Sequence, residues 1–181
     1  MLTIEGVDLL AAWASGAEVS ESDFRVVEDH GEAAKRNLMI ALREAFITPV
    51  EPEDLFAMSR GLGWILDGAG DLFREAGVLE ADPDDGIAEI TKQLAVCVRE
   101  LDSAIGDLGS SGHRAMAAAD RAIGLAREMQ PQYYLGMRVT LRLKGRRNRI
   151  GRREIYRRCL AIGDIAIDVS ERVVYAVVKE S

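Results

Sequence analysis

The chain has 181 residues, a length that suits one domain or two small subdomains sharing an interface. Hydrophobic residues make up 48% of it and charged residues 29%, a composition that excludes intrinsic disorder and is ordinary for a soluble helical protein. The formal charge is −7, but residues 138–158 contain ten Lys or Arg and one acid, which leaves −16 for the remainder. The charge is therefore bipolar.

The sequence gives no reason to expect export or membrane insertion. Residues 1–8 carry acids and no basic start, unlike a signal peptide. No apolar run approaches the roughly 18 residues that span a membrane. Cys97 and Cys159 have no CxxC partner, so we expect two small buried side chains and no redox centre. These features predict a cytoplasmic protein.

Three helices are expected in residues 1–80. The first covers about 3–15, and the second begins near Ser20, because Ser20 and Asp23 have the spacing of a capping box. The third starts with Pro52 at its first helical position. The expected buried stripe of the second helix is Val27, Gly31, Ala34, Leu38, Leu42 and Ala45.

Three more helices are expected in residues 81–181. The fourth opens with Asp82 as its cap and Pro83 at its first position. The last has the most regular apolar period in the chain. The expected ranges of the three helices are 83–108, 113–129 and 152–179.

Residues 132–144 admit two interpretations. The run 137–144 alternates apolar and polar side chains, as a strand does, but its apolar residues also fit a short helix that begins at Pro131. A helix is favoured, because an isolated strand would have no partner. Residues 144–149 are expected to form a loop on either interpretation, so a basic loop insertion is predicted around 130–151.

These elements predict an all-α fold. Two three-helix bundles, residues 1–80 and 81–181, would pack together within a single domain covering 1–181. Packed end to end, they would make an elongated rod.

Three acidic residues in the first half suggest a metal site. Glu28 and Glu32 stand one helical turn apart and project from the same side of their helix. The tight turn Phe46-Ile47-Thr48-Pro49 would bring Asp67 of the next helix close to them. Clustered carboxylates repel one another unless a cation neutralises them, and oxygen ligands suit Mg, Ca, Mn or Fe. The alternative is that all three are solvated surface acids beside the apolar stripes.

The chain resembles a known family in several short motifs. These are Glu28 to Glu32, the turn Phe46-Ile47-Thr48-Pro49, Glu53-Asp54-Leu55, Leu66-Asp67, Arg153-Glu154-Ile155-Tyr156, Ile162-Gly163-Asp164 and Val177-Val178-Lys179-Glu180-Ser181. They look like the PhoU-like proteins found beside Pit-type phosphate transporters, and the resemblance covers nearly the whole chain. It implies two packed three-helix bundles whose acidic pairs hold metal clusters. It also implies a role in regulating or assisting phosphate uptake, without a known reaction.

The resemblance assigns metal-binding roles to six acids. In the first half Glu28, Glu32 and Asp67 match, whereas Gly63 stands where the family has a second aspartate. In the second half Asp120, Asp164 and Asp168 match, as does the neighbouring His113. Met116 and Leu160 occupy the remaining acidic positions. The first site is therefore expected to be better preserved than the second.

The basic segment has several candidate partners. Its anion-binding candidates are Arg146, Arg147, Arg149, Arg152 and Arg153. Clustered arginines bind phosphate oxygens, anionic lipid headgroups or nucleic-acid backbones. No helix-turn-helix or zinc pattern favours nucleic acid. The remaining alternative is that the segment complements the acidic surface of the same chain or of a dimer partner.

No motif of an enzyme is present. The sequence lacks a P-loop, a glycine-rich phosphate loop and a nucleophile elbow, and its two histidines offer few acid–base candidates. We expect a non-enzymatic, homo-oligomeric accessory protein of a phosphate transporter, cytoplasmic or peripheral at the inner membrane face. The alternatives are a metal-free helical scaffold or a binder of polyanions or anionic membranes.

Overall fold

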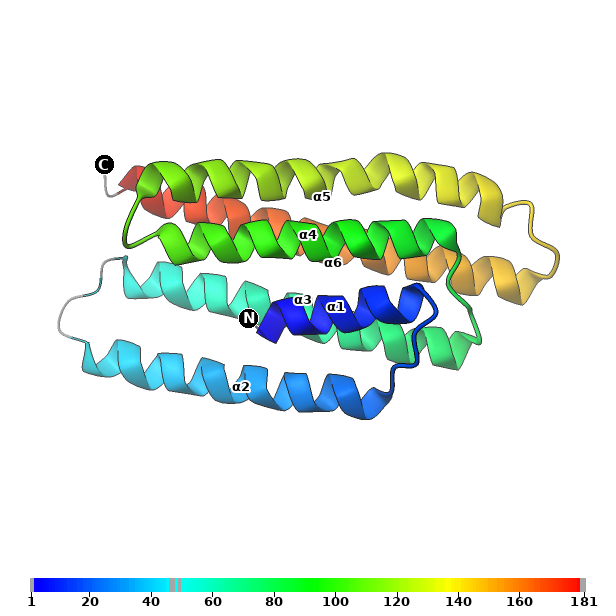
Figure 1. Cartoon of the computed structure of the whole chain (residues 1–181), viewed down its shortest axis with the longest axis horizontal. Helices are drawn as coiled ribbons and strands as arrows, with labels where there is room; N and C mark the ends of the chain where they lie inside the picture. The colour runs from blue at the N-terminus through cyan, green and yellow to red at the C-terminus, as the bar shows by residue number, and fades with distance from the viewer. Residues whose placement is uncertain (1, 46–47, 49, 180–181) are drawn as a thin grey trace.

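The computed structural model describes residues 2–45, 48 and 50–179, and its secondary structure is entirely helical (Figure 1). The helices are α1 (Leu2–Ala14), α2 (Glu21–Glu44), α3 (Pro52–Leu79), α4 (Asp85–Asp107), α5 (Gly112–Thr140) and α6 (Arg146–Lys179). No strand occurs in these described ranges, so the prediction of an all-α fold is confirmed. The predicted turn at Phe46, Ile47 and Pro49 lies outside the described residues.

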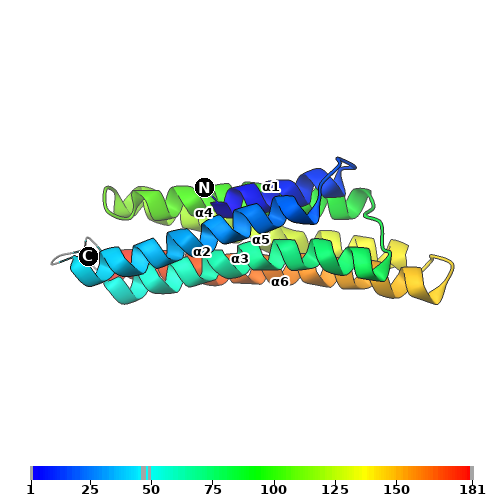
Figure 2. The ribbon, with the colours of Figure 1, turned by 90° about the horizontal axis from the view of Figure 1, so that it is seen from below.

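The helices form two triads that lie side by side. Each of α1, α2 and α3 contacts the other two, and the same holds for α4, α5 and α6. Contacts of α1 with α4 and of α3 with α6 join the triads, and Figure 2 shows these two pairs on opposite sides of the molecule. The expected end-to-end rod is therefore wrong, because α3 and α6 pack against each other along their lengths.

Two glycines of α3 allow this close approach to α6. A Cβ atom at Gly61 would overlap the Val169 side chain, and one at Gly68 would lie 3.0 Å from Cγ1 of Ile162. Gly61 and Gly68 are seven residues apart and share one face of the helix. We define this contact line as the glycine seam.

Ion pairs flank the glycine seam at both ends. The Asp54 carboxylate is 1% exposed, and its Oδ1 lies 2.6 Å from Nη2 of Arg172. Towards the other end, Nε of Arg158 donates a hydrogen bond of 2.6 Å to Oε2 of Glu75. One ion pair and one charge-assisted hydrogen bond thus join α3 to α6 on either side of the glycine seam.

The predicted starts of α2 and α3 are confirmed. Ser20 caps α2, its hydroxyl accepts a bond from the Asp23 amide, and the Asp23 carboxylate accepts one from the Ser20 amide. Pro52 is the first residue of α3. These signals are local, so the sequence alone is enough to place them.

The predicted start of α4 is wrong by two residues. Asp84 is the cap in place of Asp82, and its Oδ1 accepts bonds from the Ile87 amide at 2.9 Å and the Tyr156 hydroxyl at 2.7 Å. Its Oδ2 accepts a third bond from Nη1 of Arg152 at 3.1 Å. The partners from α6 favour Asp84, because they satisfy both of its carboxylate oxygens.

The predicted basic loop around 130–151 is also corrected. Helix α5 continues through Pro131 to Thr140 and α6 already begins at Arg146, so only residues 141–145 lie outside helices. The helical interpretation of 132–140 is right, but the break before it is absent. Packing explains this result: Gly136 lies against the buried Tyr156 ring, which outweighs the backbone hydrogen bond lost at proline.

Both cysteines are buried, as the sequence predicts. Burial raises the pKa of the Cys97 thiol and of the Cys159 thiol to about 12. Each thiol is therefore protonated at neutral pH and acts as a small core side chain.

The packing of Tyr156 gives a test of the α5–α6 contact. We expect Gly136→Ala to lower the free energy of unfolding by about 1–3 kcal/mol, because the new methyl group would overlap the buried ring. The matched control is Gly124→Ala on the same helix, where no atom lies within 4 Å. It should gain roughly 0.5–1 kcal/mol from helix propensity alone. Urea denaturation measures both, and equal effects would contradict the packing described.

Candidate functional site

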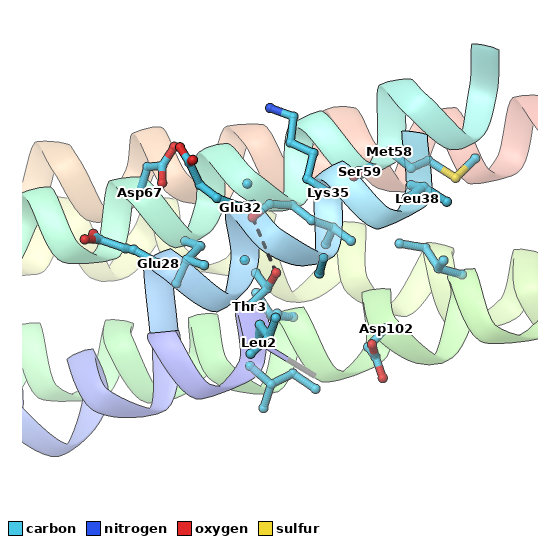
Figure 3. A pocket seen from close by; sticks show the side chains of 18 of the residues that line it. Leu2, Thr3, Glu28, Glu32, Lys35, Leu38, Met58, Ser59, Asp67 and Asp102 are labelled. Carbon is cyan, nitrogen blue, oxygen red and sulfur yellow. Dashed lines mark hydrogen bonds between the residues drawn. The ribbon is translucent and has the colours of Figure 1, made fainter. Parts of the chain in front are cut away.

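A cavity of about 390 Å³ opens between the first four helices (Figure 3). Its walls are mostly apolar, and its charged groups sit at the rim. The lining residues include Leu2 and Ile4 of α1, Leu38 of α2, Leu55, Met58 and Leu62 of α3, and Val98 and Ile105 of α4. A mainly apolar cavity with a few polar groups is typical of a binding site.

The cavity lies beside the start of α1. This helix has 13 residues, whereas α2 has 24 and α3 has 28. From α1 the cavity is lined by Leu2, Thr3 and Ile4, and the Thr3 hydroxyl donates a 3.4 Å bond to the Leu62 carbonyl.

The buried stripe predicted for α2 is wrong over most of the length of this helix. Only Phe24 and Val27 of this helix are buried. Gly31, Leu38 and Leu42 are half-buried, and Ala34 and Ala45 are exposed. The sequence does not predict the cavity, although the short first helix was a signal that the first triad has helices of unequal length.

The three acids predicted to bind metal all line this cavity. Glu28, however, already has a cationic partner. Nη2 and Nη1 of Arg74 donate bonds of 2.8 and 3.2 Å to its two oxygens, and the Glu28 side chain is 20% exposed. This bond to Glu28 is the main cause that raises the pKa of Arg74. Gly70 makes room for the pair, since a Cβ there would overlap Oε1 of Glu28.

Glu32 and Asp67 form the negative part of the rim. Figure 3 shows their carboxylates next to each other at the mouth of the cavity. Glu32 also makes an exposed pair with Arg36 at 3.1 Å. The pKa of Asp67 is raised, first by burial and then by the charges of Glu28, Asp71 and Glu32. Negative charge is therefore in excess at this edge.

The fit to a metal is incomplete. Within the described residues, no three acids, histidines or cysteines come together as a ligand group. A metal would have to compete with Arg74 for Glu28. Gly63 stands where the resemblance implies a further aspartate. The fold has space for a side chain there, because a Cβ at Gly63 would meet no atom within 4 Å.

The acids predicted for the second site lie apart from this cavity. Asp120 is exposed on α5, and Asp164 and Asp168 are exposed on α6. His113 is exposed at the start of α5. None of them belongs to a possible metal-ligand group in the part of the chain that the structure describes.

The basic segment forms one end of the molecule. We define the basic tip as residues 134–153: the end of α5, the connection and the start of α6. Figure 1 shows this hairpin, in yellow and orange, projecting past the other helices. It contains eight Lys or Arg and no acid.

The predicted anion-binding arginines divide into two groups. Arg152 is held by Asp84, with both side chains about four-fifths buried, and Arg147 makes an exposed pair with Glu80 at 2.8 Å. Arg146, Arg149 and Arg153 are exposed, and among the described residues none makes an ion pair. These three are the ones available to a partner.

Exposed apolar side chains lie among these cations. They are Tyr134, Leu135, Val139, Leu141 and Ile150, each at least 50% exposed. Leu135, Arg138 and Val139 have the i, i+3, i+4 spacing of one helical face of α5, and Arg142 follows in the connection. Basic and apolar groups are thus presented together.

None of the helices described here is long and apolar enough to cross a bilayer.

A scan against protein-family models finds no match for the chain, and a search of curated proteins finds none either. The resemblance to PhoU-like proteins therefore stays a prediction.

The Arg74–Glu28 pair can be tested by deletion. We expect Arg74→Ala to lower the free energy of unfolding by about 1–3 kcal/mol, because it leaves a partly buried carboxylate without its cation. The control Arg36→Ala removes an exposed pair and should cost less than about 0.5 kcal/mol. Thermal unfolding with added Mn²⁺ or Mg²⁺ completes the test. Metal should leave the wild-type midpoint unchanged, and a large rise abolished by Glu28→Gln would contradict this interpretation.

The raised pKa of Asp67 predicts a pH-dependent effect. The folded state holds the Asp67 proton more tightly than the unfolded state, so the ionised group destabilises the fold above its folded pKa. Asp67→Asn should therefore stabilise the protein at pH 7. This advantage should shrink as the pH falls through the folded pKa towards 3.8. Urea denaturation from pH 3 to pH 8 measures it, with Asp120→Asn as the exposed control.

Proposed function

We propose that this chain is a non-enzymatic, PhoU-like accessory protein that docks through its basic tip on the anionic membrane surface beside a phosphate transporter. One observation carries the proposal. The end of the molecule that projects farthest combines eight basic residues, no acid and five exposed apolar side chains.

The tip has the chemistry of a membrane-surface contact. A Lys or Arg close to an anionic leaflet contributes about 1 kcal/mol each, and apolar side chains add to this by entering the headgroup region. Six basic residues of the tip are exposed and, within the described chain, outside any ion pair: Arg138, Arg142, Lys144, Arg146, Arg149 and Arg153. The acidic remainder of the chain would be repelled by the same surface, so the protein would approach tip first.

The transporter partner rests on the motifs shared with PhoU-like proteins. The polar lining of the cavity consists of carboxylates, Lys35 and hydroxyls, and includes neither histidine. In this proposal Arg74 supplies the positive charge that a metal supplies elsewhere in the family, so the first triad works without a cofactor.

Vesicle binding tests the membrane contact. Neutral phosphatidylcholine vesicles and vesicles with added phosphatidylglycerol should be compared by co-sedimentation. We expect binding only to the anionic vesicles, and it should weaken as salt rises. The triple substitution Arg142→Ser, Arg146→Ser, Arg149→Ser should cost about 3 kcal/mol, or roughly a hundredfold in partitioning.

A matched control removes the same charge from the body of the molecule. Arg43, Lys92 and Arg127, all exposed, would be changed to Ser. This variant should bind as well as the wild type. Equal loss in both variants, or equal binding to neutral vesicles, would refute the role of the tip.

The transporter partner needs a separate experiment. The tagged chain should capture a phosphate transporter from detergent-treated membranes of its native cell, and the tip variant should capture less. Recovery of soluble proteins alone would contradict the transporter assignment and leave the vesicle result intact.

A further inference from the structure

We propose that the cavity of the first triad is a docking groove for a basic amphipathic helix of a partner protein. The partner helix would lie beside α1, between α2 and α3. This inference is independent of the basic tip, which lies at a different place on the molecule.

The shape of the groove matches a helix. Helix α1 buries Gly6, Val7, Leu10 and Ala14 between its neighbours. Beside the cavity, α2 continues from Gly31 to Glu44 without one buried residue. That stretch of helix rises about 20 Å, which accommodates three to four turns of a second helix.

The floor of the groove suits an apolar helix face. Leu38, Met58 and Leu62 come from α2 and α3, and Val98 and Ile105 line the cavity from α4. A flexible methionine adapts to different side chains. Groove recognition of this type reads apolar residues at i, i+3, i+4 and i+7 of the bound helix.

The rim specifies the charge of the partner. Glu32 and Asp67 stand on one side, and Asp102 lines the cavity from α4. Lys35 is the one basic residue among the lining side chains of the described chain. Crowding of like charge at Asp67 would be relieved by a cation, so a helix with Lys or Arg on its flanks fits better than an acidic one.

Gly63 offers a way to close the groove without harming the fold. It lines the cavity and is half-buried, and a Cβ atom added to it would have no other atom within 4 Å. Gly63→Leu should therefore fill the groove while raising helix propensity. Gly77→Leu is the matched control, because Gly77 lies on the same helix, outside the cavity, with equally open space.

The probe is a fluorescein-labelled helical peptide of about 16 residues with leucines on one face and lysines on both flanks. Anisotropy titrations would compare it with a glutamate-flanked version and with a scrambled version of identical composition. We expect the lysine-flanked helix to bind the wild type at least tenfold more tightly than either. Gly63→Leu should weaken binding at least tenfold, Asp67→Asn should weaken it less, and Gly77→Leu should leave it unchanged.

Three results would overturn the proposal. The first is equal binding of the scrambled peptide, which would show that net charge alone attracts it. The second is binding that Gly63→Leu leaves unchanged. The third is a wild-type dimer that Gly63→Leu dissociates in sedimentation velocity, which would make a second copy of this chain the occupant.

Discussion

The rest of the structure depends on the close approach of α3 and α6 along the glycine seam. Gly61 and Gly68 let Val169 and Ile162 of α6 pack directly on the α3 backbone, and an ion pair joins the buried Asp54 to the partly exposed Arg172. This contact turns two triads into one body. It also places the basic start of α6 at one end of the molecule and leaves the short α1 to complete the first triad. The position of the tip therefore follows from how α3 and α6 are aligned, whereas the cavity lies among the first four helices.

The sequence predicts those features of the fold that are decided locally. Ser20 with Asp23 and the position of Pro52 mark helix starts correctly, because a cap bonds to residues within one turn. Asp82 fails as a cap because Tyr156, more than 70 positions away, bonds to Asp84. The predicted break near Pro131 fails for a related reason. Local propensity favours an end there, but packing of α5 on α6 determines the outcome.

In the candidate site, too, the features decided by local spacing are predicted, and those decided by contacts between distant residues are not. Helical spacing correctly places Glu28 and Glu32 on one side, and the next helix brings Asp67 to the same rim. The bidentate bond of Arg74 to Glu28 was not predictable, since no motif links residues 46 positions apart. The cavity is lined by residues of four helices, and no local pattern in the sequence marks such a combination. The apolar stripe of α2 therefore predicts a buried face, although only Phe24 and Val27 of this helix are buried.

The fixed alignment of α6 has a consequence for any protein that engages both the tip and the groove. Val169 packs on Gly61, beside the groove, and lies twenty residues from Arg149 of the tip. At 1.5 Å per residue this separates the two surfaces by about 30 Å. With the long axis upright on a bilayer, a groove-binding helix tethered to a membrane protein needs a linker of roughly nine extended residues. In the proposed arrangement, the distance between the basic tip and the groove would set the shortest tether that allows both contacts at once.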